Sequence, residues 1–314
     1  MFIMVYAAAN PTPTGDAATA VTLIGCGYVG VRVAQLEQAA GRACAAVSHQ
    51  QRHAAELAQL DLTVHRADLD HIANLKTLPL DGADLYYFAP PPAAGQQDTR
   101  LRNLRAACQD RAQPRRLVLI STTSVYGDCQ GAWVDETRTP NPQTDRARRR
   151  LDAERTARDW ATRNHFPLSI LRVPGIYGPH RLPLTRLQRG LPVLHETASP
   201  WSNRIHVDDL ARACLAAMRC AAGGIFNVAD GSPSTMTDYF NQAADALNLP
   251  RPRQISPAQA QQQLSPEMRS YLAESKRLDI TRLRRVLGVA PIFADLGHGL
   301  ADAVRRQSPQ CSQP

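Results

Sequence analysis

The chain has 314 residues, 44% of them hydrophobic and 20% charged, which excludes both a disordered chain and a small disulfide-stapled scaffold. Its formal charge is +8, yet only two of its 36 basic residues, Lys76 and Lys276, are lysines. Because an arginine stays protonated near neutral pH, a mechanism that needs a lysine depends on one of these two. Seven scattered cysteines without a Cys-x-x-Cys pair predict reduced thiols and no metal site.

Short apolar runs alternate with longer amphipathic stretches through the first half, a rhythm that predicts an α/β fold with a Rossmann-like, doubly wound parallel sheet. The expected strands are 20–25, 43–48, 62–67, 83–89, 117–121 and 168–173, and the expected helices are 28–40, 52–60, 99–111 and 144–164. We expect a flexible extension over 1–19 and a dinucleotide-binding Rossmann domain over 20–178. A smaller α/β substrate lobe over 179–306, whose chain returns to the Rossmann core, and a frayed tail over 307–314 complete the prediction.

A Gly-x-Gly-x-x-Gly turn follows the first expected strand, at Gly25, Gly27 and Gly30. Glycines allow the tight turn and the approach of backbone to a pyrophosphate, and the helix that opens at Tyr28 and Val29 directs free N–H groups at the anion. This turn predicts a dinucleotide site, and the alternative is a tight turn without a ligand.

The second strand ends in Ser48, His49 and Arg52, without the acidic residue that usually binds the ribose diol of NAD. A hydroxyl, an imidazole and a guanidinium suit a 2′-phosphate, so we predict NADP(H) in preference to NAD(H), although Arg52 can also simply open an exposed helix. Asp68 and Leu69, after the third strand, are expected near the adenine, where Asp68 can instead be an ordinary loop residue.

A series of motifs along the chain resembles the extended short-chain dehydrogenase/reductase superfamily of NAD-dependent epimerases and dehydratases. The motifs are Gly25–Gly30, Ala67–Leu69, Ser121–Asp128, Leu171–Pro179, Arg204–Leu210 and Phe226–Gly231, followed by Ser275–Leu278. The Ala89–Pro92 segment is most similar to an atypical subgroup of that superfamily. The resemblance implies a Rossmann domain with a C-terminal substrate lobe and a reaction on a nucleotide sugar or a similar anionic small molecule.

The same resemblance implies roles for individual positions. Thr122 matches the residue that hydrogen-bonds the reacting hydroxyl or carbonyl, and Tyr126 is among the nearest phenols in the motifs. Further cofactor contacts are expected at Ala89, Pro90, Arg150, Pro174 and Gly175, and substrate contacts at Ser124, Arg146, Tyr177, Arg204 and His206.

The chain departs from the superfamily at its Tyr-x-x-x-Lys signature, in which a tyrosine transfers the proton and a lysine assists it. Arg146 and Arg150 stand at these two positions, and the residues four before the lysines are Ile72 and Leu272. An arginine cannot transfer a proton near neutral pH. The arginines can bind a substrate anion or the cofactor, or they can form a solvated helix face with nearby carboxylates.

Two functions therefore remain open. One is an enzyme with non-standard catalytic residues, in which another group, or water oriented by Thr122, supplies the proton. The other is a catalytically silent NADP(H)-binding sensor or scaffold. Dispersed arginines without interleaved aromatic residues argue against nucleic acid as a partner. No run of 18–20 apolar residues predicts a membrane span, so we expect a cytoplasmic protein. It is expected to be a monomer or a homodimer, and the like charges around Arg146–Arg150 disfavour pairing through that helix.

Overall fold

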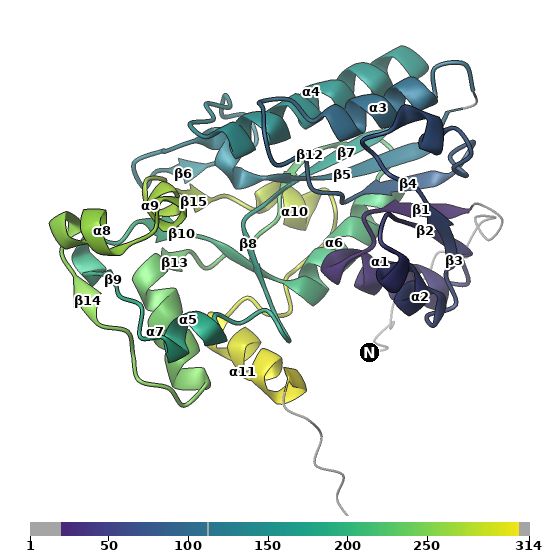
Figure 1. The fold of residues 1–314 in the computed structure, drawn as a ribbon. Coiled ribbons are helices and arrows are strands. Elements are labelled where there is room, and N and C mark those ends of the chain that lie inside the picture. The colour runs from purple at the N-terminus through teal and green to yellow at the C-terminus, as the bar shows by residue number, and fades with distance from the viewer. Residues whose placement is uncertain (1–19, 112, 308–314) are drawn as a thin grey trace, which may run out of the picture.

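The computed structural model describes residues 20–111 and 113–307 (Figure 1), so the predicted extension and all but the first residue of the predicted tail lie outside it. Seven parallel strands form the central sheet in the order β12-β7-β5-β4-β1-β2-β3. They are β1 (Val21–Ile24), β2 (Cys44–Ser48), β3 (Thr63–Arg66), β4 (Asp84–Tyr87), β5 (Arg116–Thr122), β7 (Leu168–Val173) and β12 (Gly224–Asn227). This sheet confirms the predicted fold class, and β12 is a strand that the sequence pattern did not predict.

Strand β5 shows why these runs are apolar throughout. Leu117 and Leu119 pack into the core under α3 (Thr99–Ala107) and α4 (Asp145–Asn164), whereas Val118 and Ile120 pack into the core under α1 (Tyr28–Ala39) and α6 (Val207–Arg219). Figure 1 shows α3 and α4 on one face of the sheet and α1 and α6 on the other. The helices of this part are α1 (Tyr28–Ala39), α2 (Gln51–Ala58), α3 (Thr99–Ala107), α4 (Asp145–Asn164), α6 (Val207–Arg219) and α10 (Thr281–Arg285). A strand buried on both faces needs apolar side chains at successive positions.

Helix α4 begins and ends at recognisable signals. The Thr144 side chain accepts a hydrogen bond from the backbone N–H of Ala147, and His165 ends the helix in the left-handed conformation at a φ of 54°. Helix α3 is shorter than the predicted 99–111, since Cys108 closes it after Ala107. The two helices lie side by side, joined by the ion pair of Arg102 with Asp152.

A smaller lobe gathers short elements of the C-terminal half around a core that includes Leu187, Tyr239, Phe240 and Leu300. Its elements are α5 (Leu184–Gln188), β9 (Val193–Leu194), the 3-10 helix η3 (Glu196–Ala198), β10 (Trp201–Ser202), β13 (Ser234–Thr235), α7 (Met236–Ala246), β14 (Gln254–Ile255), α8 (Pro257–Gln263), α9 (Pro266–Leu272) and α11 (Leu296–Gln307). No described helix combines the length and the apolar character that a membrane span requires.

Two short parallel strand pairs lie between the sheet and the lobe. They pair β8 (Gly175–Tyr177) with β11 (Arg204–His206), and β6 (Trp133–Val134) with β15 (Arg277–Leu278). The 3-10 helices η1 (Ile72–Leu75) and η2 (Thr123–Tyr126) complete the fold, and η2 follows β5 directly. The chain therefore carries the carboxyl ends of β5 and β7 straight into the segments that face the lobe.

Candidate functional site

The glycine turn lies between β1 and α1 with its outer side open. A Cβ added to Gly25, at a φ of +89°, would lie 2.5 Å from the backbone nitrogen of Ala89, so this glycine permits the turn to touch the chain after β4. A Cβ added to Gly27 would meet nothing within 4 Å, and no side chain caps the N-terminus of α1 there. The free N–H groups and the space beside them fit a pyrophosphate.

Side chains from neighbouring elements hold this turn in place. His53, on α2, donates from Nε2 to the carbonyl oxygen of Cys26 at 2.9 Å. The Tyr28 hydroxyl donates to the carbonyl of Pro179 at 2.9 Å, and burial raises the pKa of Tyr28 to about 12. The Tyr28 side chain thus links α1 to the segment that enters the lobe. A contact of Tyr28 or Val29 with a cofactor stays a prediction.

The end of β2 presents no carboxylate between positions 48 and 52. Ser48 is buried and its hydroxyl donates to the Gln50 carbonyl at 3.3 Å, whereas Arg52 extends into solvent and pairs with Glu56 at 3.3 Å. Such an exposed ion pair contributes little to stability, so Arg52 is free to exchange Glu56 for another anion.

Asp68 lies beyond β3 and is already engaged by its own turn. Its carboxylate accepts from the backbone N–H of Asp70 at 2.9 Å and lies 3.0 Å from the His71 ring and 3.8 Å from the His49 ring. These contacts, the backbone hydrogen bond first, hold the pKa of Asp68 below its usual value. The carbonyl of the neighbouring Leu69 accepts from Asn103 at 2.9 Å, which fixes the loop against α3.

Arg150 lies against the sheet edge. Its Nη1 donates to the carbonyls of Ala89 at 3.2 Å and Ile120 at 3.3 Å, which follow β4 and lie within β5. Burial lowers the pKa of this guanidinium, and no carboxylate of the described chain lies within ion-pair distance of it. The carbonyl of Pro90, next along the chain, accepts from Arg100 at 3.1 Å.

Thr122 ends β5 and caps the next turn. Its Oγ1 accepts from the backbone N–H of Ser124 at 3.3 Å, so the hydroxyl proton stays available to a ligand. Directly behind it, the Ser121 hydroxyl donates to Glu154 at 2.6 Å, and Glu154 forms a two-point ion pair with Arg172 at 2.8 and 3.1 Å. This buried network fixes the end of β5 against α4 and β7.

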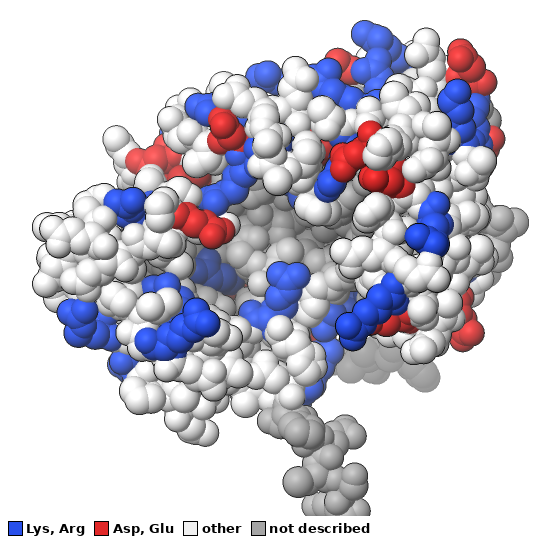
Figure 2. Space-filling view, in the orientation of Figure 1, with Lys and Arg blue, Asp and Glu red and all other residues white. Residues whose placement is uncertain are grey.

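A cavity of about 680 Å³ separates the Rossmann part from the lobe. Figure 2 shows the face of the molecule hollowed at this place, with Lys and Arg side chains along its walls. Predicted residues that line it are Thr122, Ser124, Arg146, Arg150, Pro174, Gly175 and Arg204. The lobe adds Arg186, Trp201, Met236, Tyr239, Phe240, Tyr271, Glu274 and Lys276.

Four arginines on the cavity walls have no carboxylate of the described residues within ion-pair distance. Arg204 is buried, its Nη1 donates to the Asn203 carbonyl at 2.7 Å, and its guanidinium stacks 4.3 Å from the Tyr239 ring centre. Burial lowers the pKa of Arg186 and Arg204, as it does for Arg150. The Nη2 atom of Arg146, the fourth, is buried without a hydrogen-bond partner.

Lys276 and Glu274 form the one ammonium–carboxylate pair on these walls in the described chain, at 2.7 Å. Both side chains are buried, and Glu274 Oε1 has no partner. The cavity therefore carries five cations against one carboxylate. Uncompensated buried charge is costly, and a negatively charged ligand is the kind of group that would offset it.

Three of the predicted site residues, Tyr126, Tyr177 and His206, are buried and do not line the cavity. Tyr126 is 1% exposed, donates to Asn227 at 2.7 Å, and has its pKa raised by burial to about 12, so it is a structural phenol. Tyr177 is fully buried and packs edge-on against His206 with ring centres 5.3 Å apart. His206 is also fully buried.

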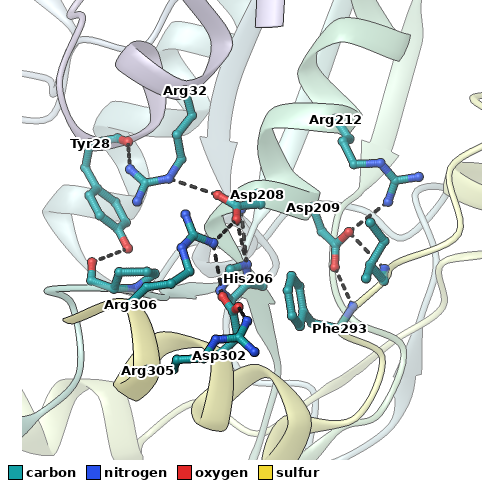
Figure 3. A network of polar contacts seen from close by, with 12 residues as sticks. Tyr28, Arg32, His206, Asp208, Asp209, Arg212, Phe293, Asp302, Arg305 and Arg306 are labelled. Atoms are coloured by element: carbon teal, nitrogen blue, oxygen red, sulfur yellow. Dashed lines mark hydrogen bonds and ion pairs between the residues drawn. The ribbon is translucent and has the colours of Figure 1, made fainter. Parts of the chain in front are cut away.

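His206 belongs instead to a polar network that joins α1, α6 and α11 (Figure 3). Its Nδ1 accepts from the backbone N–H of Asp208 at 3.3 Å, and its Nε2 lies 3.5 Å from Asp302. The three side chains have the spacing of metal ligands, but Arg32 pairs with Asp208 at 3.0 Å and Arg306 with Asp302 at 3.0 Å. Guanidinium groups thus already balance both carboxylates, which makes the network a link between the sheet and the lobe.

Sequence reasoning missed the cavity walls that the lobe supplies. Tyr239 and Tyr271 lie outside every motif that was recognised, as does Arg186. Lys276 carried two signals, since it is one of only two lysines and stands in the late Ser275–Leu278 motif, but neither indicated that it faces the site.

Comparison with known proteins gives a consistent picture. The model of the NAD dependent epimerase/dehydratase family matches residues 21–229. The Escherichia coli K12 protein YeeZ is 26% identical over 247 residues, 74% of this chain and 85% of YeeZ. A functionally unknown conserved protein from Silicibacter pomeroyi is similar in structure, with a TM-score of 0.79 at 28% identity, covering 91% of this chain and 98% of that one. UDP-glucuronic acid 4-epimerase from Bacillus cereus, solved with UDP-glucuronic acid and NAD, is also similar in structure. Its TM-score is 0.72, and the match covers 92% of this chain and 98% of that one. The sequence identity of 18% means that this similarity shows a shared fold alone.

Proposed function

Since the chain belongs to the NAD-dependent epimerase/dehydratase family, we propose that it binds a nicotinamide dinucleotide and acts on a nucleotide sugar or a similar anionic small molecule. The reaction would be an oxidoreduction, an epimerisation or a dehydration. The observation that carries this proposal is the cavity at the sheet edge, whose five cations face one carboxylate.

The open side of Gly27 and the uncapped N-terminus of α1 support a pyrophosphate site at the glycine turn. Ala89, Pro90 and Arg150 would then border the dinucleotide, with Pro174 and Gly175 beside the nicotinamide amide. When bound, the dinucleotide supplies or accepts the hydride of the reaction.

NADP(H) is our preferred cofactor because the end of β2 offers hydroxyl, imidazole and guanidinium groups and no carboxylate. A 2′-phosphate gains charge-assisted hydrogen bonds from such groups, whereas a ribose diol needs an acceptor. The exposed Arg52, held only by Glu56, supports this preference.

For the substrate, Arg204 and Arg186 on the lobe side support binding of a phosphate or carboxylate, with Arg146 opposite them on α4. Thr122, with its hydroxyl proton free, would hydrogen-bond the reacting oxygen, and Ser124 stands beside it. Gly175 leaves room for Arg204, because a Cβ there would lie 3.1 Å from Arg204 Cδ.

A second candidate is a dinucleotide-binding sensor without turnover. The observation that favours it is that α4 presents arginines at positions 146 and 150, neither of which can transfer a proton near neutral pH.

Calorimetric titration with NADPH and NADH, followed by incubation with UDP-glucuronic acid or UDP-glucose and chromatography of the products, tests the proposal. We expect NADPH to bind at least about tenfold more tightly than NADH, because a phosphate–guanidinium contact is worth about 1.5 kcal/mol or more. Absence of any dinucleotide binding would refute both candidates. Tight binding together with no conversion of any anionic sugar tested would favour the sensor.

A further inference from the structure

Oxidation of an alcohol or reduction of a carbonyl requires a group that moves a proton at the reacting oxygen. Histidine, aspartate and cysteine are absent from the cavity walls in the described chain. The side chains of suitable chemistry there are two phenols, Tyr239 and Tyr271, and the Lys276–Glu274 pair. The candidate proton-transferring groups on these walls are therefore Tyr239, Tyr271, Glu274 and Lys276. All four come from the lobe or from the segment that leaves it.

Tyr239 is unsuited to this role. It is 8% exposed, its ring lies between the Arg204 guanidinium and Phe240, and burial raises the pKa of its phenol. Because burial favours the protonated phenol, Tyr239 is poorly suited to form the phenolate that proton transfer requires.

The ammonium group of Lys276 is already paired with the carboxylate of Glu274. Its ammonium donates to Glu274 at 2.7 Å, and only 6% of the side chain is exposed. Loss of that proton would leave Glu274, which already has one unpartnered oxygen, as a buried carboxylate without its counter-charge. The pair is better suited to hold a ligand hydroxyl, with one donor and one acceptor.

Tyr271 differs from both. It lies on α9 and is 41% exposed while lining the cavity, so its phenol can exchange protons with solvent. The guanidinium of Arg146 stacks 3.8 Å from its ring centre, from the first turn of α4 on the other side of the cavity. Among the described tyrosines it is the exposed one, and its hydroxyl forms no hydrogen bond with the residues that the structure describes.

We propose that Tyr271 is the proton-transferring catalytic residue of this site and that Arg146 is its positioning residue. The inference rests on the proposed function. In the reducing direction the phenol O–H bond breaks, an O–H bond forms on the substrate oxygen as its carbon receives the hydride, and water reprotonates the phenolate. In the oxidising direction the phenolate accepts the hydroxyl proton. The stacked guanidinium supplies positive charge beside the phenolate and fixes the ring, as cations over aromatic faces do.

In this arrangement Arg146 assists proton transfer by Tyr271 without transferring a proton itself. An arginine cannot move the proton, but the guanidinium of Arg146, stacked on the ring of Tyr271, can hold that ring in position. The phenol thus comes from the lobe and the cation from α4, so the two parts must pack together for the site to be complete.

The kinetic test uses the full chain, NADPH or NADP⁺, and whichever of UDP-glucuronic acid and UDP-glucose it converts. Tyr271→Phe keeps the stacked ring and removes only the hydroxyl. We expect it to lower kcat at least about 100-fold, the usual size of general acid–base catalysis, with KM for the sugar and affinity for NADPH within about threefold of wild type. Lys276→Met is measured in parallel. Retention of more than one third of kcat by Tyr271→Phe, or a loss confined to Lys276→Met, would overturn the proposal.

A second readout does not depend on turnover, so it separates failure of this inference from failure of the proposed function. Tetranitromethane nitrates phenolates, and mass spectrometry of the digested protein locates the modified ring. We expect nitration at Tyr271 to be at least about fivefold slower in Arg146→Met than in wild type, while Arg146→Lys, which keeps the charge, stays within about twofold. Equal rates in all three proteins would show that Arg146 does not support the phenolate, and the pair would be rejected even if a sugar substrate is found.

Discussion

Replacing Arg204 by methionine should make the protein more stable and a poorer binder of anions. The guanidinium is buried on the cavity wall, where Asn203 and Ser202 accept from it and no described carboxylate pairs with it. Burial lowers the pKa of Arg204, which means that the folded protein disfavours its charged form. Methionine fills similar space against Tyr239 without a charge.

The expected change in the free energy of unfolding is the difference between a desolvation cost and the hydrogen bonds that partly offset it. Burying an ion without an ion-pair partner costs several kcal/mol, and the more distant Asp230 carboxyl and the hydrogen bonds to neutral partners, about 1 kcal/mol each, return part of that cost. We expect Arg204→Met to gain about 1–3 kcal/mol in the free energy of unfolding without ligand, a rise in Tm of about 2–6 °C. The lost charge-assisted hydrogen bonds to phosphate should weaken binding of UDP about 10- to 150-fold.

Thermal denaturation and calorimetric titration with UDP measure the two effects on the same protein. The exposed Arg189, on no cavity wall, provides the control, and Arg189→Met should change neither quantity. A fall in Tm for Arg204→Met would refute the claim that this charge is uncompensated. Unchanged affinity for UDP would refute the claim that the cavity is built for an anion.

Three further changes test other parts of the structure. Gly27→Ala should keep Tm within about 2 °C yet weaken NADPH binding at least about tenfold, because its Cβ enters the space left for the pyrophosphate, whereas Gly25→Ala should fold poorly, since its Cβ would lie 2.5 Å from the backbone of Ala89. If Gly27→Ala and Gly25→Ala changed Tm and NADPH affinity equally, the pyrophosphate would not lie beside Gly27. Ser48→Asp should reverse the preference of the protein in favour of NADH, measured by fluorescence titration, and an unchanged ratio of the two affinities would place the 2′-phosphate elsewhere. Burial raises the pKa of Asp230 to about 7, so between about pH 4 and pH 7 the unfolded chain loses this proton while the folded protein keeps it, and stability falls as pH rises. Asp230→Asn should therefore gain up to about 4 kcal/mol over wild type at pH 7.5 and almost nothing at pH 4, and a gain independent of pH would show that the carboxyl titrates normally.

The middle of the sheet could be predicted from the sequence because its central strands β1, β4 and β5 are buried on both faces. Leu117 to Ile120 is an unbroken apolar run, since alternate side chains enter different cores. The glycine turn was equally predictable, since Gly25 occupies a φ of +89° that other residues rarely adopt. In both cases the constraint lies within a few neighbouring residues, which is the range over which sequence patterns carry information.

The lobe wall could not be predicted in this way. Trp201 lies on a strand of two residues and Lys276 in the irregular stretch just before another, and such segments are too short for a hydrophobic period to appear. Tyr271 lies on a seven-residue helix whose place beside Arg146 depends on how the lobe packs against α4. Contacts between residues more than 100 positions apart do not affect the local spacing of apolar and polar residues, so a sequence pattern cannot predict them.

Whether a residue of a recognised motif serves the fold or the chemistry depends on what surrounds its polar atoms. The hydroxyl of Tyr126 is bound by Asn227 and its ring lies under Arg172, so a change there would disturb buried partners before it reached a ligand. In the described chain the buried Nη2 atom of Arg146 has no such partner, and the guanidinium stacks on the ring of Tyr271. We therefore expect a substitution at position 146 to change the proposed reaction and to leave the sheet intact. For this reason the fold of the family can persist in a chain whose α4 has no proton-transferring tyrosine, provided that another element brings a phenol to the same cavity.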